Sequence, residues 1–304
     1  MKIIVPNCYP RFRCIANRCR HSCCIGWEID IDPKTREKYR HVSGEFGKRL
    51  NAAIVDGEVS HFRLGEGERC PMLNVNGLCD LITELGEENL CQICADHPRF
   101  RSYFSDRTEL GLGLCCEEAA RLVLTQTEAM MLIPLEDDGT DEVLPEDEAD
   151  LLALRGELIA LVQDGSRPLS ARLDAMLDAV GFAIPERDWA EVYRSLERLD
   201  PRWDACLDGM APIGTDAPAE LTGALVNFAA YLLYRHLPGA LEDDDIPGRV
   251  AFCVLSTRVL AALCAGKPGC TMADCIEFAR MYSSEIEYDE DNVAALLDAL
   301  WEDA

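Results

Sequence analysis

Cysteine is the residue type whose number and spacing stand out in this 304-residue chain. Nine of the 16 cysteines fall in three compact groups within the first 116 residues. The groups are Cys14, Cys19, Cys23 and Cys24; Cys70 and Cys79; and Cys91, Cys94 and Cys115. Cysteine at this density is typical either of a disulfide framework in a small secreted domain or of thiolate ligands for a metal in a reducing compartment.

The rest of the sequence favours reduced thiols. The first residues, Met1 to Pro6, are not followed by an apolar segment long enough for a signal peptide. The longest uncharged stretch, Leu221 to Tyr234, has 14 residues, whereas a membrane-spanning helix needs roughly 18 to 20. We therefore expect a cytoplasmic protein that has no membrane partner. A disulfide framework stays open as an alternative if the chain is exported by another route.

Thiolates are soft donors that suit zinc or iron–sulfur clusters. Two sulfurs on one loop can bind one centre, and both Cys91-x2-Cys94 and Cys19-x3-Cys23 have that spacing. Side chains of adjacent residues diverge, so Cys23 and Cys24 either serve different centres or include one spare thiol. Nine thiols exceed the four that a tetrahedral zinc or a cubane cluster requires. The count predicts two centres, or one cluster with auxiliary thiols.

Charge is distributed very unevenly along the chain. Residues 1–124 carry 17 lysines and arginines against 18 acids, whereas residues 125–304 carry 12 against 37. The second part therefore holds −25 of the net charge of −26. Such an acidic chain would be repelled by phosphate backbones, so we expect no nucleic-acid partner and favour a lysine-bearing protein. For most of these acids, solvated helix faces are the simpler explanation.

Apolar spacing predicts a mainly α fold. Residues 134–150 contain nine acids, two prolines and no basic residue, which predicts an acidic linker. Beyond it, three- and four-residue spacing and helix-capping residues predict an all-α domain over 151–304. Its predicted helices include 217–236, 247–265, 271–283 and 290–302, and Thr271 with Asp274 resembles a helix start. Before the linker we predict an irregular cysteine-rich, metal-binding domain over 1–133, with little β structure.

Three local elements are predicted in the cysteine-rich part. The segment Trp27 to Asp32 alternates apolar and acidic residues and predicts a short strand. Asp32 and Pro33 are suited to cap and begin a helix over 34–54. Another short helix is predicted within 84–94.

Several motifs in order along the first 125 residues resemble the flagellin lysine-N-methylase family, part of a wider group of zinc- or iron-chelating proteins with a CxxCxxCC motif. The first is Phe12-Arg13-Cys14-x4-Cys19-x3-Cys23-Cys24-x2-Trp27. The second runs from Cys70-Pro71-Met72-Leu73-Asn74 through Cys79-Asp80 to Cys91-x2-Cys94 and Pro98-Arg99. The third is Cys115-x-Glu117, where Cys116 replaces the usual proline and is not expected to be a ligand.

The resemblance implies a protein lysine N-methylase that uses S-adenosylmethionine, acts on a flagellin-type substrate and carries a cysteine-bound iron–sulfur cluster, 4Fe-4S in type, with zinc as the alternative. The sequence itself shows no methyl transfer: Gly65-x-Gly67 follows no predicted strand, and the radical-enzyme spacing Cys-x3-Cys-x2-Cys is missing. A non-catalytic metal-binding module with a helical interaction domain therefore stays open.

Lysine attacks a methyl sulfonium only when its amine is neutral, so the site must desolvate it or supply a base. Candidate catalytic residues near the motifs are Asp30, Tyr39 and His97. Trp27 could hold a cation against its ring, and Arg99 could bind a cofactor carboxylate. Trp27 packing beside the metal loop, and Arg99 pairing with a nearby acid, are equally open.

Five cysteines remain in the second half: Cys206, Cys253, Cys264, Cys270 and Cys275. Cys206 and Cys253 lie in apolar surroundings, which predicts small buried side chains. The spacing Cys264-x5-Cys270-x4-Cys275 could form a weak site, but helix ends often bury free cysteine, and we assign no ligand there.

Overall fold

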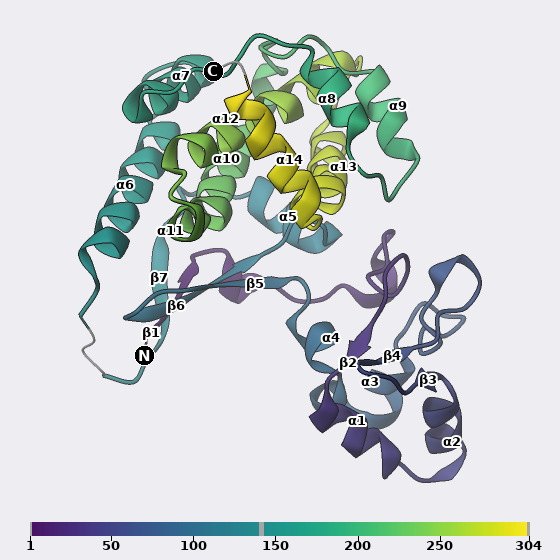
Figure 1. Ribbon diagram of the computed structural model, residues 1–304. Coiled ribbons are helices and arrows are strands. Elements are labelled where there is room, and N and C mark those ends of the chain that lie inside the picture. Colours follow the sequence, from purple (N-terminus) through teal and green to yellow (C-terminus); the bar gives the residue numbers. More distant parts are fainter. Residues whose placement is uncertain (1, 140–142, 303–304) are drawn as a thin grey trace. The chain divides into compact units, whose positions relative to one another are not determined.

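The structure is a computed structural model that describes residues 2–139 and 143–302 (Figure 1). Contacts divide the chain into two compact units. The large unit combines the residues up to Phe12 with those from Phe100 onward, and the small unit is Arg13–Arg99. These bounds differ from the predicted domains 1–133 and 151–304, because the first strand pairs with strands that follow residue 99.

A four-stranded sheet in the large unit joins distant parts of the sequence. Its strands, in the order β5-β6-β1-β7, are Arg99–Tyr103, Arg107–Leu112, Lys2–Pro6 and Leu132–Asp137. Strand β1 runs parallel to β6, with Lys2 opposite Arg107, and antiparallel to β7, with Pro6 opposite Leu132. The predicted linker 134–150 thus includes the end of β7, and a helix begins at Glu146. Its residues 140–142 lie outside the described residues.

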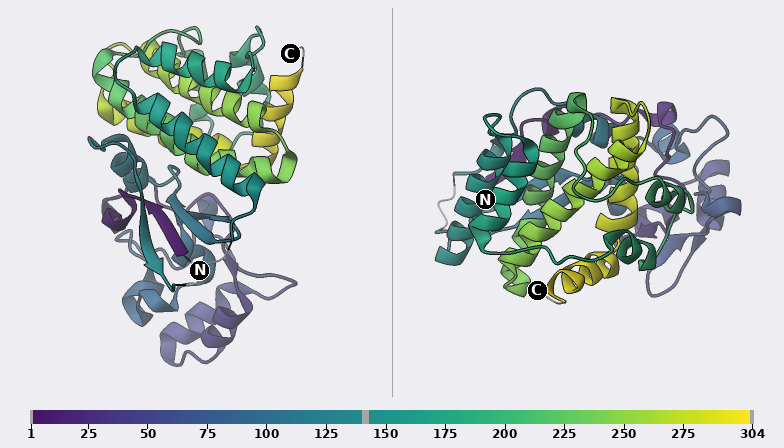
Figure 2. Two further views of the ribbon diagram at one scale, coloured as in Figure 1. Left: turned by 90° about the vertical axis from the view of Figure 1, so that its left-hand side faces the viewer. Right: turned by 90° about the horizontal axis from the view of Figure 1, so that it is seen from above.

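The helices of the large unit gather on one side of this sheet (Figures 1 and 2). They are α5 (Glu117–Leu124), α6 (Glu146–Gln163), α7 (Leu169–Val180), α8 (Trp189–Ser195), α9 (Arg202–Asp208), α10 (Thr222–His236), α11 (Ala240–Asp243), α12 (Ile246–Gly266), α13 (Met272–Tyr282) and α14 (Glu290–Trp301). A π-helical turn, Ser283–Glu287, follows α13. Helices α10 and α12 lie side by side at the centre.

Helix α12 forms the middle of the core because it is apolar nearly all round. Fifteen of its 21 residues are buried. By length and composition it could cross a membrane, and it is the one such helix among the described residues, but 78% of the relevant window is buried inside the protein. Burial of this kind is typical of a central core helix. The predicted start of the next helix is confirmed, since Thr271 and Asp274 form a capping box.

The small unit combines short elements with long loops. Its strands, in the order β2-β4-β3, are Asp30–Ile31, Ser60–Phe62 and Ile54–Val55. Its helices are α1 (Pro33–Arg40), α2 (Gly44–Ala52), α3 (Asp80–Leu85) and α4 (Gln92–Asp96). The single helix predicted over 34–54 is broken between α1 and α2, where Gly44 has a φ of +80°.

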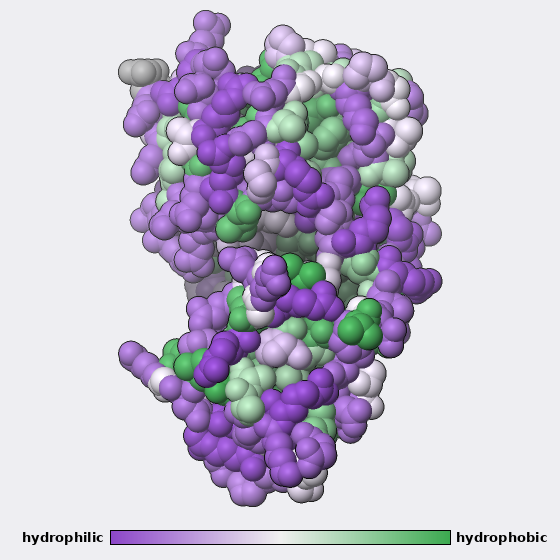
Figure 3. All heavy atoms as spheres, turned by 90° about the vertical axis from the view of Figure 1, so that its right-hand side faces the viewer, coloured by the Kyte–Doolittle hydropathy of each residue, from purple (hydrophilic) through white to green (hydrophobic). Residues whose placement is uncertain are grey.

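The mainly α prediction is confirmed by fourteen α-helices among the described residues. Seven short strands correct the expectation of little β structure, whereas residues 151–302 contain only helices and their connections. On the face shown in Figure 3, hydrophilic residues cover most of the surface and apolar residues are scattered.

Candidate metal centre

Five of the predicted ligands come together in the core of the small unit. They are Cys24, Cys70, Cys79, Cys91 and Cys94. Cys70 and Cys91 are 4% and 0% exposed, and the other three pack against the same apolar cluster. We call these five side chains the thiol group.

Backbone pairing places the first three members. The Cys70 amide donates a hydrogen bond of 2.8 Å to the Cys24 carbonyl, and Leu73 forms a β-bridge with Cys79. Cys91 caps α4 at its N-terminus and Cys94 is the third residue of that helix, so one helical turn presents both sulfurs. Four segments that are separate in the sequence therefore deliver thiols to one place.

The thiols interact electrostatically. A hydrogen bond from Cys23 lowers the pKa of Cys24 to about 7. Burial raises the pKa of Cys70 to about 12, and the neighbouring thiols Cys24, Cys79 and Cys91 add to that rise. The hydrogen bond between Cys94 and Cys91 raises the pKa of Cys94, the donor, and lowers that of Cys91. Such mutual repulsion between thiolates is relieved by a bound cation.

The donor chemistry of the thiol group suits a soft metal, since it supplies sulfur in apolar surroundings. The positions of these side chains, however, do not form a complete set of metal ligands. Among the residues that the structure describes, no three histidine, cysteine, aspartate or glutamate side chains are arranged so that they could hold a metal ion.

The other predicted ligands lie elsewhere. Cys14 and Cys23 are exposed, and the Cys19 thiol donates to the His21 carbonyl at 3.0 Å. Cys115 belongs to the large unit, where burial raises its pKa to about 12 and the Tyr288 hydroxyl is a hydrogen-bond partner. The nine predicted ligands are therefore divided between the two units, eight in the small one and Cys115 in the large one.

Two of the predicted site residues, Trp27 and His97, are brought together. Their ring centroids are 6.1 Å apart, and the Trp27 indole donates to the Cys23 carbonyl at 2.6 Å. Desolvation, with a smaller contribution from Arg99, lowers the pKa of His97 to about 4, so this ring is neutral at pH 7. Trp27 also packs against the apolar core of the small unit, which contains Cys70 and Cys91.

The remaining candidates have other surroundings. Asp30 is exposed on β2, opposite His61. Tyr39 is fully buried, and its hydroxyl donates to the Asn89 carbonyl at 2.8 Å. Arg99 donates to the Ala95 carbonyl at 3.2 Å. Tyr39 thus has a structural partner, and only Asp30 of these three is openly accessible.

Asp32 has a larger structural role than predicted. Its side chain accepts hydrogen bonds of 2.9 Å from the amides of both Thr35 and Gln92. The predicted helix cap is confirmed, and the same carboxylate also holds the start of α4. Burial alone would raise its pKa, but the bonds from Gln92 and Thr35 outweigh burial and lower it.

A buried polar network in the large unit was not predicted. Glu287 in the π-helical turn contacts the His236 ring at 2.8 Å and accepts from the Tyr231 hydroxyl at 3.1 Å, while Arg235 donates to its carbonyl at 3.0 Å. Burial would raise the pKa of Glu287, but Arg235 and His236 outweigh it and lower the pKa. The sequence signal was a tyrosine followed four residues later by Arg-His in an otherwise apolar helix.

The cysteines of the second half behave partly as predicted. Cys253, Cys264 and Cys275 are 0% exposed, whereas Cys206 is only partly buried. Cys264 is hydrogen-bonded to Cys275 and Cys270, so these three thiols lie together, at a place where we assigned no ligand.

Comparison with known proteins supports the resemblance. The chain is 28% identical over 136 residues to a lysine-N-methylase of Salmonella typhimurium and 29% identical over 135 residues to one of Salmonella choleraesuis. Each match covers 42% of this chain and 33% of the relative, so the chain spans about a third of the length of either enzyme. A third relative, the flagellar biosynthetic protein FliU of Salmonella muenchen, is 27% identical over 136 residues, or 79% of its own length.

No family model and no solved structure matches the chain. Two of these relatives are named lysine-N-methylase, as the resemblance implied, and the third carries a flagellar name. Over part of its length, the chain is similar to the flagellin lysine-N-methylase family.

Proposed function

We propose that this protein is a lysine N-methylase that transfers methyl groups from S-adenosylmethionine to lysines of another protein. One observation carries the proposal: two of its relatives are named lysine-N-methylase. The third relative's name, a flagellar biosynthetic protein, favours flagellin as the substrate. The acidic second part of the chain supports a lysine-bearing partner, because its charge attracts cations over about 8 Å at physiological ionic strength.

We also propose that the thiol group binds an iron–sulfur cluster, 4Fe-4S in type, with zinc as the alternative. Cys70, Cys91, Cys94 and Cys24 are the first candidates, because they lie in or against one core and come from three separate segments. A bound cluster would supply a redox-active centre, and its ligands would cross-link those segments. Trp27, which packs against the same core, and His97, whose ring lies 6.1 Å from that of Trp27, are the aromatic side chains we propose for its surroundings.

The substrate lysine has to lose its proton before it attacks the sulfonium. We therefore expect the methylation rate to rise with pH until deprotonation no longer limits it. The enzyme would act in the cytoplasm, without a nucleic-acid or membrane partner.

Co-expression with flagellin tests the activity. Intact-mass and peptide mass spectrometry should find lysines heavier by steps of about 14 Da, one methylene each, and only when S-adenosylmethionine is available. Cys91→Ser should abolish the modification, whereas Cys253→Ser, a buried cysteine of the large unit, should not. If no lysine changes mass while the metal site is fully loaded, the methylase proposal is wrong and a metal-binding module is the better account.

Anaerobic purification tests the metal. A cluster-loaded protein should be brown and should absorb broadly through thiolate-to-iron transitions. A colourless protein that contains stoichiometric zinc would rule out the iron–sulfur cluster and support zinc as the bound metal.

A further inference from the structure

Four arginines among the described residues are buried: Arg36, Arg155, Arg172 and Arg280. Burying a guanidinium is costly unless a carboxylate pairs with it. Arg36 pairs with Asp56 at 2.7 Å, and Arg155 pairs with Glu109 at 2.8 Å. Arg36, Arg155 and Arg280 each have a carboxylate partner, whereas Arg172 has none among the described residues.

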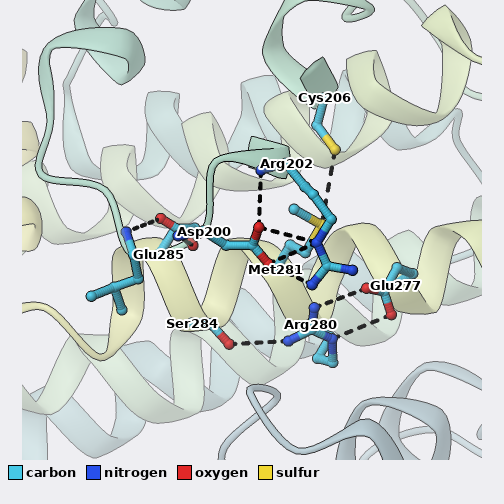
Figure 4. Close-up of polar contacts among 9 residues, drawn as sticks. Asp200, Arg202, Cys206, Glu277, Arg280, Met281, Ser284 and Glu285 are labelled. Atoms are coloured by element: carbon cyan, nitrogen blue, oxygen red, sulfur yellow. Dashed lines mark hydrogen bonds and ion pairs between the residues drawn. The ribbon is translucent and has the colours of Figure 1, made fainter. Parts of the chain in front are cut away.

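Arg280 shows the usual solution (Figure 4). Its guanidinium, on α13, donates to the two carboxylate oxygens of Glu277 at 2.8 and 3.2 Å and to the Ser284 hydroxyl at 3.4 Å. The side chain is buried, with 6% of the residue exposed, and its charge is balanced within one helical turn.

Arg172 is as buried as Arg280, at 5% exposed, but lacks such a partner. Among the described residues its hydrogen bond goes from Nη1 to the Val162 carbonyl at 2.6 Å, and its buried Nε has no partner. No carboxylate lies within ion-pair distance in the described chain. Asp164 interacts with Arg172 electrostatically and partly offsets its charge, but both Asp164 oxygens accept from Ser166. Burial lowers the pKa of Arg172, and repulsion from Arg167 adds to the shift.

A cavity of about 500 Å³ adjoins this unbalanced charge. Arg167, Arg172 and Arg258 line it, and Asp216 is the acidic side chain in its wall. Arg258 is paired with Asp174 at 2.5 Å. The wall also contains Pro168, Leu169 and Ser170, the start of the twelve-residue helix α7.

The start of α7 adds further donors. Pro168 stands at the cap position and gives the helix no side-chain cap, so the first amides of α7 lack that acceptor. Helix N-termini attract anions through these amides and through the helix dipole. In a part of the chain with a charge of −25, Arg167, Arg172 and the uncapped start of α7 gather positive charge around one cavity, whereas Asp174 offsets Arg258.

We propose that this cavity is a binding site for an oxyanion, the phosphate or carboxylate group of a small molecule, with Arg172 as its buried counter-charge. The proposal does not depend on the methylase activity. An oxyanion would balance Arg172 and accept from the first amides of α7, and Arg167 and Arg258 would add attraction at the mouth. No residue of the predicted metal site is involved.

Thermal unfolding of the full-length protein in sodium phosphate, sodium acetate and sodium chloride, at equal pH and ionic strength, tests the site. Phosphate or acetate at about ten times its dissociation constant should raise the melting temperature by roughly 3 °C over chloride. A larger response to phosphate assigns a phosphate ligand, and a larger response to acetate assigns a carboxylate. The same melting temperature in all three salts would overturn the proposal.

Two variants separate the site from general salt effects. Arg172→Met should remove the anion response while keeping or raising the melting temperature in chloride, because an unbalanced buried charge is lost. Arg280→Met is the matched control: it should lower the melting temperature, because Glu277 loses its partner, but keep the anion response. If Arg172→Met fails to fold, Arg167→Gln at the cavity mouth should weaken anion binding at least threefold. An unchanged anion response in both cavity variants would refute the assignment.

Discussion

The two units use cysteine in different ways. The large unit has a core of 52 buried residues, in which Cys253, Cys264 and Cys275 fill space among leucines, alanines and aromatic rings. The small unit has only eleven buried core residues, two of them cysteines, and three more thiols pack against them. A few short helices and strands bury little apolar surface, so we expect the small unit to depend on the metal proposed for its thiols.

The same side chain therefore has two physical roles in one molecule. A cysteine inside a large apolar core is a small hydrophobic residue whose exchange costs packing energy alone. A cysteine in a small core made partly of thiols would contribute stability through the metal that we propose for it. Four experiments test this contrast, from the largest expected effect to the smallest.

Metal removal should affect only the small unit. Structural metal sites in small domains contribute roughly 10 kcal/mol, so chelation or Cys91→Ser should unfold residues 13–99 and leave the helices of the large unit intact. Limited proteolysis with hydrogen exchange would show rapid cleavage within 13–99. Cys253→Ser is the control and should keep full metal content, since that thiol lies in the large core. Equal metal loss in the two variants would show that the division of the cysteines is wrong.

Removing a large side chain from the core of the large unit should destabilise that unit and leave the small unit intact. Trp203 is 1% exposed and packs edge-on against Tyr282, with ring centroids 6.3 Å apart. Trp203→Ala should lower the free energy of unfolding of the large unit by about 4 kcal/mol. Denaturant unfolding followed by circular dichroism measures this. Metal content should stay unchanged, and a loss of metal would mean that the units unfold together.

The small unit also depends on one carboxylate. Asp32→Ala removes the side-chain acceptor from two helix starts at once, and we expect a cost of about 2 kcal/mol, twice that of an ordinary cap. Asp30→Ala is the matched control on the neighbouring exposed position and should change stability by less than about 0.5 kcal/mol. Similar losses from both variants would remove the double-cap interpretation.

The smallest effect concerns the α13 capping box. Asp274 accepts from the Thr271 amide at 2.9 Å and pairs with Lys267 at 2.7 Å, and these contacts lower its pKa to about 2. Asp274→Ala should cost about 1 kcal/mol near pH 6. Because the pKa is lower in the folded state, this contribution is present above about pH 4 and is lost as the pH falls towards 2. A difference between wild type and variant that persists at pH 2 would contradict the assignment.

Local sequence signals predicted the last three helices of the large unit well, and they predicted the helices of the small unit and most strands poorly. Helices α12, α13 and α14 were expected within two residues of their observed bounds, because apolar spacing and capping residues are local. Strand β1 was not predicted, since Ile3, Ile4 and Val5 form a short apolar run whose partners lie more than a hundred residues away.

Predictions of the candidate sites were limited in the same way, because contacts between distant segments cannot be derived from local sequence. Cysteine spacing identified thiols that the structure gathers, such as Cys24, Cys70 and Cys91. It could not show that Cys115 belongs to the other unit, which depends on where the chain returns to the large unit at Phe100. Nor could it identify Arg172 among 29 basic residues, because its lack of a partner is a property of the folded surroundings.

The parallel pairing of β1 with β6 has a consequence for synthesis on the ribosome. The strand Lys2–Pro6 is translated about a hundred residues before Arg107 and Leu132, which lie opposite its two edges. The whole of Arg13–Arg99 emerges in the meantime and can close on its own internal contacts. A nascent chain should therefore carry a folded insert behind an open β-branched strand, which is prone to pair with other chains. We expect chaperones that bind short apolar segments to occupy residues 2–6 until β7 has been synthesised.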